Sequence, residues 1–412
     1  MTPHDHPAPT STDESAAPAA PGRRLRVAVI GTRGYPSFYG GFETAVRRLA
    51  PALADAGWEV TVYGRAGGSA DDAVRSTGPA SPLGTGGRDG RDPRIVRRVT
   101  RGLETRSLST LTHGLTAVVD AAWRRPDVVL VMNCANGFWL PLLRARGVPT
   151  LVNVDGIEWE RAKWGRLARL IFRLGAVATA RWADRIVCDA REIARRWRED
   201  FGVDGVFVPY GADEPHADPV ESGLEAGRYA LLVARFVPEN TVDEFIEAAE
   251  RIAERHDVVF VGSSGYGGAL DRRVAELAER SPRVRHLGHL RDDRRLHALW
   301  RNAGAYFHGH SVGGTNPALV QAMMCGAPVV ARDTVYNREV LGDAAVFVPP
   351  EPGAIAAGVL TVLDDAGLAR RIGDAARRRA RERYGWRQVC SAYETELRRL
   401  VEGSGRTRRA RR

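Results

Sequence analysis

The stretch YFHGHSVGGTNPALVQAMMCGAPVVA, from Tyr306 to Ala331, decides the fold of this chain. An apolar run is followed by two glycines, a helix-like segment, Gly326 and a second apolar run. Thr315 or Asn316 can cap the helix because either side chain can accept hydrogen bonds from free amides, and Pro317 suits the first helical position. The stretch therefore predicts a strand, a tight turn, a helix and a second, parallel strand.

The same alternation of strand and helix extends in both directions. From Arg26, apolar segments such as RVAVIG, EVTVYG and DVVLVMN alternate with amphipathic helices, and after a polar, turn-rich segment the alternation starts again at YALLVAR. We predict an α/β protein with two Rossmann-like, doubly wound domains, residues 23–211 and 228–402, joined by a linker over 212–227. Ligands bind at the carboxyl ends of the strands in open parallel sheets, so the two domains should face a central cleft.

Four further segments complete this organisation. Residues 1–22 are rich in Pro, Ala, Ser and Thr and lack the apolar core of a secretion signal, which predicts a disordered leader. Residues 66–93 are rich in Gly, Ser, Asp and Pro and predict a mobile insertion. We expect the last long helix, over about residues 367–401, to end by packing across the first domain, followed by a basic tail over 403–412.

The net charge of +10 raises nucleic acid and anionic membranes as partners. Five arginines lie in the tail GRTRRARR, and Lys163 is the only lysine, so the charge is an arginine bias spread along the chain. The sequence contains no recognisable module that reads nucleic acid, and we expect no such partner. A solvated surface is the simplest interpretation; contact of the arginine-rich tail with an anionic membrane is the alternative.

The cysteines and the apolar runs indicate the compartment. The four cysteines form no Cys-x-x-Cys pair, so free buried thiols are expected, and no His/Cys cluster has the spacing of a metal site; they are Cys134, Cys188, Cys325 and Cys390. No apolar run approaches the roughly 18–20 residues that span a bilayer. We expect a cytoplasmic protein that reaches at most the inner face of the plasma membrane.

The first loop that carries chemistry is GTRGYPSFYGGFET, after the first strand. Gly40 and Gly41 lie just before an amphipathic helix, whose first free amides attract anions, and Arg33 adds a positive charge with two-pronged geometry for phosphate. The alternative is a simple tight turn. The loop is not G-x-G-x-x-G and no acidic residue follows at the ribose-binding spacing, which disfavours a nicotinamide cofactor.

The opening stretch supplies a second anion-binding loop in the other domain. The amides of Gly314, Thr315 and Asn316 lie at the start of its helix. His308 and His310 share one face of the strand because they are two residues apart, and they can hydrogen-bond a sugar hydroxyl or a phosphate. Buried, satisfied core histidines are the alternative.

Two charged residues directly follow strands. Arg235 after YALLVA can neutralise a diphosphate in the cleft, although a plain surface charge is the alternative. Asp155 after PTLVNV can bind a hydroxyl or act as a base, or it can cap the next helix. Together with the two glycine loops, these residues predict a nucleotide-diphosphate ligand that carries a polyhydroxylated group. No P-loop is present, which argues against ATP hydrolysis.

The motifs GTRGYPSFYGGFET, NVDGIEWERAKW, RFVPENT, HGHSVGGTNPALVQAM and NREVLG resemble the bacterial rhamnosyltransferase-like members of glycosyltransferase family four. The resemblance runs from about Arg26 to about Tyr393, without the insertion. It implies the GT-B fold and sugar transfer from a nucleotide diphosphate donor, often dTDP-L-rhamnose, with retention at the anomeric carbon. It further implies a glycan or lipid-linked acceptor in cell-surface polysaccharide synthesis, and no metal.

Site residues are carried over from this resemblance by position. Gly40 and Gly41 would lie near the phosphates and the acceptor, Arg235 would contact the diphosphate, and the segment 314–316 would bind phosphate through backbone amides. Asp155 falls near the place where many relatives have an active-site histidine. The catalytic set implied is Asp155, Arg235 and His310.

The sequence departs from the family pattern at three positions. Asn240 stands where family members usually have a lysine, Gln321 replaces a glutamate that holds the nucleotide ribose, and Gly313 replaces its partner glutamate. Glutamine can still hydrogen-bond a ribose diol, but more weakly than a carboxylate. Diphosphate charge must then be met by Arg235, helix amides and Arg33.

No carboxylate stands out as a nucleophile, so we expect front-face displacement in which the leaving phosphate takes the acceptor proton. Three alternatives stay open: a nucleotide-sugar 2-epimerase of the same fold, a non-catalytic nucleotide-sugar-binding protein, and a nucleic-acid-binding protein.

Overall fold

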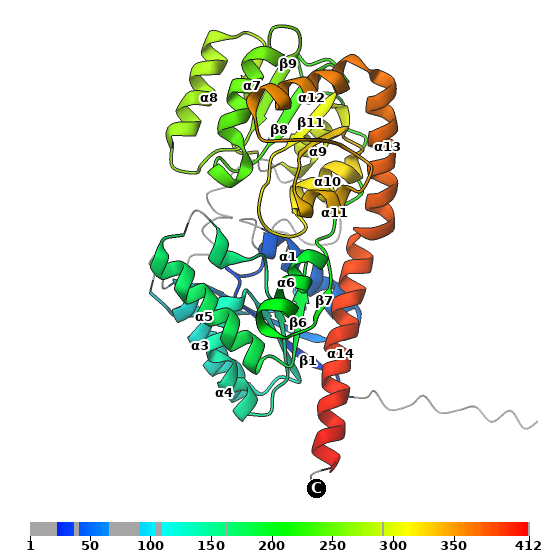
Figure 1. Ribbon diagram of the computed structural model, residues 1–412. Helices are drawn as coiled ribbons and strands as arrows, with labels where there is room; N and C mark the ends of the chain where they lie inside the picture. Colours follow the sequence, from blue (N-terminus) through cyan, green and yellow to red (C-terminus); the bar gives the residue numbers. More distant parts are fainter. Residues whose placement is uncertain are drawn as a thin grey trace, which may run out of the picture.

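The chain folds into two α/β domains in the computed structural model, which describes residues 23–36, 41–65, 91–103, 109–161, 164–290 and 292–410 (Figure 1). The predicted two-domain α/β architecture is confirmed. The leader 1–22, Gly40 and nearly all of the insertion 66–93 lie outside the described residues.

The first domain is built on a parallel sheet in the order β3-β2-β1-β4-β5-β6-β7. Its strands are β1 (Arg26–Ile30), β2 (Glu59–Arg65), β3 (Val96–Thr100), β4 (Val128–Met132), β5 (Thr150–Asn153), β6 (Arg185–Cys188) and β7 (Gly205–Phe207). The central strands are buried on both faces, as the uninterrupted apolar runs predict. Helices cover both faces, which makes the domain doubly wound.

One face of this sheet carries α1 (Gly41–Asp55), and the other carries α3 (Ser109–Arg124), α4 (Leu140–Ala145), α5 (Arg166–Trp182) and α6 (Arg191–Phe201). Two short 3₁₀ helices, η1 (Cys134–Trp139) and η2 (Glu158–Glu160), follow β4 and β5. Because every strand is parallel, the loops after β1, β5 and β6 emerge at the same edge of the sheet. This edge faces the second domain.

The second domain repeats the plan with a parallel sheet in the order β10-β9-β8-β11-β12-β13. Its strands are β8 (Tyr229–Val233), β9 (Asp257–Val261), β10 (Val284–His286), β11 (Ala305–His308), β12 (Val329–Arg332) and β13 (Val346–Val348). Its helices are η3 (Pro238–Asn240), α7 (Val242–Ile252), α8 (Ala269–Arg280), α9 (Asp293–Asn302), α10 (Pro317–Cys325), α11 (Val335–Leu341), α12 (Pro352–Asp364) and α13 (Ala366–Arg383).

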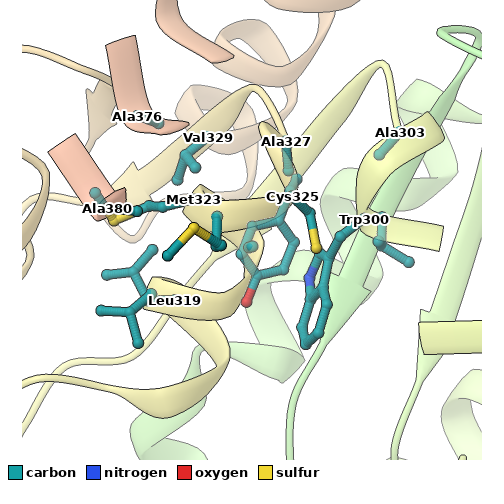
Figure 2. Close-up of a cluster of buried hydrophobic side chains, with 14 of the residues drawn as sticks. Trp300, Ala303, Leu319, Met323, Cys325, Ala327, Val329, Ala376 and Ala380 are labelled. Atoms are coloured by element: carbon teal, nitrogen blue, oxygen red, sulfur yellow. The ribbon is translucent and has the colours of Figure 1, made fainter. Parts of the chain in front are cut away.

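Helix α10, which opens the predicted anion-binding loop, is anchored by one of the largest apolar clusters. Leu319, Met323 and Cys325 are fully buried against Trp300 of α9 and Ala376 of α13 (Figure 2). The helix ends at Gly326, whose left-handed φ of 77° suits a residue without a Cβ. The start of α10 is therefore held on a rigid support.

The last helical segment differs from the sequence prediction of one helix followed by a separate tail. It is two helices, α13 and α14 (Trp386–Ala410), separated at Tyr384 and Gly385, where the chain forms a bridge with Ala212 of the linker. As expected, it packs back on the first domain: α14 lies against α1 and the first sheet (Figure 1). The predicted tail over 403–412 continues this helix as far as Ala410.

Among the described helices, none by itself is long and apolar enough to cross a membrane. Helices α12 and α13 meet that test only as a pair, across a bend of 98°.

Candidate functional site

The starts of α1 and α10 meet at the boundary between the domains. A Cβ on Gly41, the first residue of α1, would lie 3.5 Å from the ring of Pro317, the first residue of α10. Asn316 caps α10, because its side-chain oxygen accepts from the amides of Ala318 at 2.9 Å and Leu319 at 3.4 Å. Gly41 of the first glycine loop thus lies beside the start of α10, which follows the second loop.

The two helix starts differ in charge. The first turn of α1 contains Glu43, which is buried, whereas the first turn of α10 contains no acidic residue. A carboxylate at a helix N-terminus offsets the positive end of the helix dipole. The start of α10 therefore suits a phosphate, and the start of α1 suits neutral hydroxyl groups.

The loop before α10 lies directly on the first domain. Gly313 adopts a left-handed φ of 100°, and a Cβ at Gly314 would collide with the carboxylate of Asp189. The hydroxyl of Thr315 donates to the backbone carbonyl of Asp189. Glycine at 314 is therefore required by the close approach of the two domains.

Two carboxylates approach this loop from adjacent strands. Asp155 follows β5 with a left-handed φ of 62°, and its amide donates to Oδ1 of Asn153 at 2.9 Å. Asp189 follows β6 and is buried, with 3% of its surface exposed. Burial, together with the nearby charge of Asp155, raises the pKa of Asp189 well above its ordinary value. Burial thus favours the neutral form of the Asp189 carboxyl group.

Arg161 supplies positive charge beside these acids. Burial opposes its charge, but Glu158 and then Asp155 outweigh burial and raise the pKa of Arg161. Its Nε lies 2.6 Å from Glu158, whose other oxygen accepts from the indole of Trp164 at 3.0 Å. The guanidinium also reaches the second domain, 3.4 Å from a Cβ position on Gly313.

His308 ends β11 and is buried. The hydroxyl of Tyr306 lies 3.0 Å from its Nδ1, and burial lowers the pKa of His308 to about 3. The imidazole is therefore neutral, and its Nε2 has no hydrogen-bond partner among the described residues. A neutral ring with an unpartnered nitrogen is able to bind a sugar hydroxyl, but it adds no charge for a phosphate.

His310 faces the glycine loop and is held by Asn240. Its Nδ1 lies 2.6 Å from Oδ1 of Asn240, whose amide nitrogen donates to the carbonyl of Arg235 at 2.8 Å. The second bond fixes the orientation of the amide, so Nδ1 of His310 is the donor. Its Nε2 then lies 3.4 Å from a Cβ position on Gly313, toward the domain boundary. Asn240, where the family pattern has a lysine, thus positions His310.

Arg235 and Arg33 follow interior strands of their sheets, β8 and β1. The Arg235 side chain is exposed, and none of the hydrogen bonds or ion pairs found among the described residues uses its guanidinium. Arg33 is half-buried, and its carbonyl accepts from the amide of Arg65 at 3.1 Å. Both are at the carboxyl edge of a sheet, as predicted.

The side chain of Gln321 makes two hydrogen bonds with the linker that the sequence did not indicate. Its Oε1 accepts from the amide of Asp213 at 2.9 Å, and its Nε2 donates to the carbonyl of the same residue at 2.8 Å. The Asp213 carboxylate pairs with Arg48 of α1 at 2.5 Å. Gln321 therefore links the second domain to the linker, and its binding of a ribose stays a prediction.

Two family models match the chain. "Glycosyltransferase Family 4" matches residues 39–214, and "Glycosyl transferases group 1" matches residues 217–379, so the match changes at the linker. Each match covers one of the two α/β domains, and the chain has the GT-B fold. Residues 1–38, 215–216 and 380–412 lie outside the two matches, so strand β1 and helix α14 are not covered.

The relatives of this GT-B chain include glycosyltransferases of several kinds. It is 32% identical over 229 residues to phosphatidyl-myo-inositol mannosyltransferase of Mycolicibacterium smegmatis, an alignment that covers 52% of this chain and 57% of that protein. It is 26% identical over 417 residues to glycogen synthase of Mycobacterium tuberculosis, covering 89% and 93%. The chain thus spans little more than half of the mannosyltransferase.

Solved structures agree with the GT-B fold. Sucrose-phosphate synthase from Thermosynechococcus elongatus superposes with a TM-score of 0.73 at 20% identity, covering 92% of this chain and 100% of that one. HepE of Anabaena, in complex with UDP, superposes with a TM-score of 0.68 at 16% identity and the same coverage. At these identities the likeness concerns the fold alone.

Sequence reasoning missed Asp189, Arg161 and Glu43 at the domain boundary. Asp189 had a usable signal, since it directly follows the apolar strand RIVC just as Asp155 follows TLVN and Val154. Arg161 and Glu43 had none, because each lies within a helical or turn segment with other charged residues. Among the described residues, no group of three His, Cys, Asp or Glu side chains could hold a metal ion.

Proposed function

We propose that this chain is a glycosyltransferase that moves a sugar from a nucleotide diphosphate donor to a hydroxyl acceptor. The observation that carries the proposal is the meeting of two helix starts of opposite character, α10 without an acidic residue and α1 with Glu43, at the domain boundary. The two glycosyltransferase family matches support it, as do the named relatives.

In the proposed mechanism the donor diphosphate binds the second domain. The amides of segment 314–316 and the exposed guanidinium of Arg235 would neutralise it, which contributes several kcal/mol in a site that excludes water. The acceptor would dock on the first domain, near Gly41 and Asp155. His310 would hydrogen-bond the transferring sugar through its Nε2, held by Asn240.

The transfer step is a front-face displacement with retention. The bond between the anomeric carbon and the diphosphate oxygen breaks, and a bond from the acceptor oxygen forms on the same face of the sugar. The leaving phosphate oxygen takes the acceptor proton, so no protein nucleophile is required. Closure of the two domains, with Gly314 on Asp189, would exclude water from this step.

The donor and acceptor are proposed more narrowly from the sequence resemblance. We propose dTDP-L-rhamnose as the donor and a glycan or lipid-linked acceptor in cell-surface polysaccharide synthesis, at the cytoplasmic side of the plasma membrane. The named relatives are mannosyltransferases and glycogen synthase, and the HepE structure contains UDP, so other bases and sugars belong in the test.

The test is thermal unfolding of the chain with dTDP, UDP, GDP, dTDP-rhamnose and a short DNA duplex, each separately. A ligand at about 100 times its dissociation constant stabilises by about 2.7 kcal/mol, a shift of a few degrees for a chain of this size. Selective stabilisation by one nucleotide diphosphate supports the proposal and names the base. Stabilisation by DNA alone contradicts it. Interconversion of the sugar without acceptor would instead identify an epimerase.

A further inference from the structure

Helix α5 presents an outward face made only of Leu, Val and Arg side chains. Its exposed residues are Arg166, Leu167, Leu170, Arg173, Leu174, Val177 and Arg181. The apolar members are 72%, 53%, 48% and 48% exposed in chain order, and they recur at spacings of three and four residues. They therefore form one continuous stripe along the helix, on the side away from the core.

Neighbouring helices widen this stripe. Leu142 on α4 is 42% exposed, and Val119 and Trp123 on α3 are 54% and 81% exposed. Helix α4 packs against both α3 and α5, and the three helices lie along the same flank of the first domain (Figure 1). At the end of α5, the guanidinium of Arg181 lies 5.0 Å from the ring of Trp182.

The charge of this flank has one sign along α5. The helix contains four arginines and no acidic residue over its 17 residues, and α4 adds Arg144 without an acid. No salt bridge among the described residues involves Arg166, Arg173 or Arg181, whereas arginines on α6 and α9 pair with carboxylates. A partner that matches this flank must therefore combine an apolar surface with negative charge.

We propose that the outward face of α5 docks the chain on an anionic phospholipid bilayer. The helix would lie in the plane of the interface, with Leu and Val side chains below the headgroups and the arginines at the phosphates. At 17 residues it is about 25 Å long, with arginines through its length, so it lies on the membrane and does not span it. A second copy of the chain is less suited to cover this face, because the arginines of the two copies would face each other and repel.

The docking face begins next to the cleft. Helix α5 starts one residue after Gly165, and the preceding Trp164 bonds to Glu158, which pairs with Arg161 at the domain boundary. Docking would therefore hold the cleft beside the headgroups. Membrane docking would bring a lipid-linked acceptor close to the proposed site, and this benefit rests on the proposed function. The docking of α5 on the membrane does not rest on it.

The test is flotation of the full chain with phosphatidylcholine vesicles, with and without phosphatidylglycerol. We expect binding only to the anionic vesicles, with a steep dependence on salt. Replacing Leu170→Asp and Leu174→Asp together should weaken vesicle binding at least about tenfold. Tyr266→Asp, at a residue 81% exposed in the second domain, is the matched control and should change nothing. Replacing Arg166, Arg173 and Arg181 by Gln should also weaken binding and reduce its salt dependence.

Each variant changes exposed side chains only, so its circular dichroism and unfolding temperature should match those of the parent chain. Wild-type binding retained by the Leu170→Asp, Leu174→Asp chain would overturn the proposal. So would loss of binding on removal of residues 405–412 alone, which would assign the contact to the arginine-rich end. Absence of vesicle binding, with a dimer in gel filtration that the two aspartates dissociate, would show an interface between copies instead.

Discussion

At the scale of single residues, the contact of Gly314 with Asp189 couples the phosphate-binding loop to the first domain. The loop can lie on the buried carboxyl group only because residue 314 has no Cβ. The sequence indicated glycine here for its turn, but the reason visible in the structure is close approach across the domain boundary. Sequence patterns show a glycine's conformational freedom, and they do not show what lies against it.

We predict that Gly314→Ala reduces kcat/KM about 100-fold, because a displacement of the loop by about 1 Å misplaces the diphosphate. The circular dichroism spectrum should be unchanged. Gly403→Ala on α14, where a Cβ would meet nothing within 4 Å, is the control and should keep full activity. Normal kinetics of Gly314→Ala would show that the closed contact is not used in turnover.

Arg235 is the exposed cation at the end of an interior strand of the second sheet. We predict that Arg235→Ala lowers kcat at least about 100-fold, because the leaving diphosphate loses its direct counter-charge. Arg370→Ala, an exposed arginine on α13, should leave kcat unchanged. The measurement is initial-rate kinetics with the donor identified by thermal unfolding, and comparable rates for both variants would remove Arg235 from the site.

At the scale of elements, α10 serves two purposes. Its start carries the proposed phosphate-binding loop, and its second turn holds the linker through the paired bonds between Gln321 and Asp213. Asp213 in turn pairs with Arg48 of α1. Rigid support of α10 by the apolar cluster therefore fixes both the site and the junction of the domains (Figure 2).

The variant Gln321→Glu separates this role from ribose binding. A carboxylate cannot donate to the backbone carbonyl of Asp213 and would place an acceptor against that oxygen, so we predict a loss of about 1–3 kcal/mol in the free energy of unfolding. Urea denaturation measures this loss. If Gln321 instead binds ribose, the same variant should bind nucleotide diphosphate more tightly without loss of stability, since charged hydrogen bonds are roughly twice as strong.

Helices and strands could be predicted where the sequence features that define them lie within a few residues of each other. The loops GGFET and SVGGTNP were placed before helices because capping and turn residues act within a few positions. The strand β3, VRRVT, was not singled out, because it is an edge strand whose side chains are largely exposed. The break between α13 and α14 was missed for a similar reason: Gly385 lies in a helical pattern, and its bridge to Ala212 is a contact across the molecule.

At the scale of the whole molecule, a buried acid with a raised pKa, Asp189, lies between the domains. The pKa of Asp189 is raised by burial and by Asp155, so the folded chain holds a proton that the unfolded chain releases above about pH 4. Its contribution to stability is therefore present at low pH and is lost as the pH rises toward the raised pKa. His308 acts in the opposite sense, because its pKa is lowered to about 3 and protons favour its unfolded form below about pH 6.5.

We predict that Asp189→Asn removes the part of the pH dependence that comes from Asp189. The free energy of unfolding of the parent chain, relative to the variant, should fall as pH rises, by at most about 1.4 kcal/mol per pH unit. His308 is present in both chains, so its contribution cancels in the difference. Denaturation at several pH values between about 5 and 8 provides the measurement, and parallel curves would mean that Asp189 ionises freely in the folded chain.

The sequence by itself determined two parallel α/β domains, and the placement of the loop before α10, His310, Arg235 and Asp155 at strand ends. Hydrophobic periodicity, helix capping and turn residues act over a few positions, so they can be recognised in the sequence. Only the tertiary structure decided that Thr315 meets Asp189, 126 positions earlier, and that Gln321 meets Asp213, 108 positions earlier. These contacts depend on how closely two folded domains approach each other, and that distance is set by packing between them.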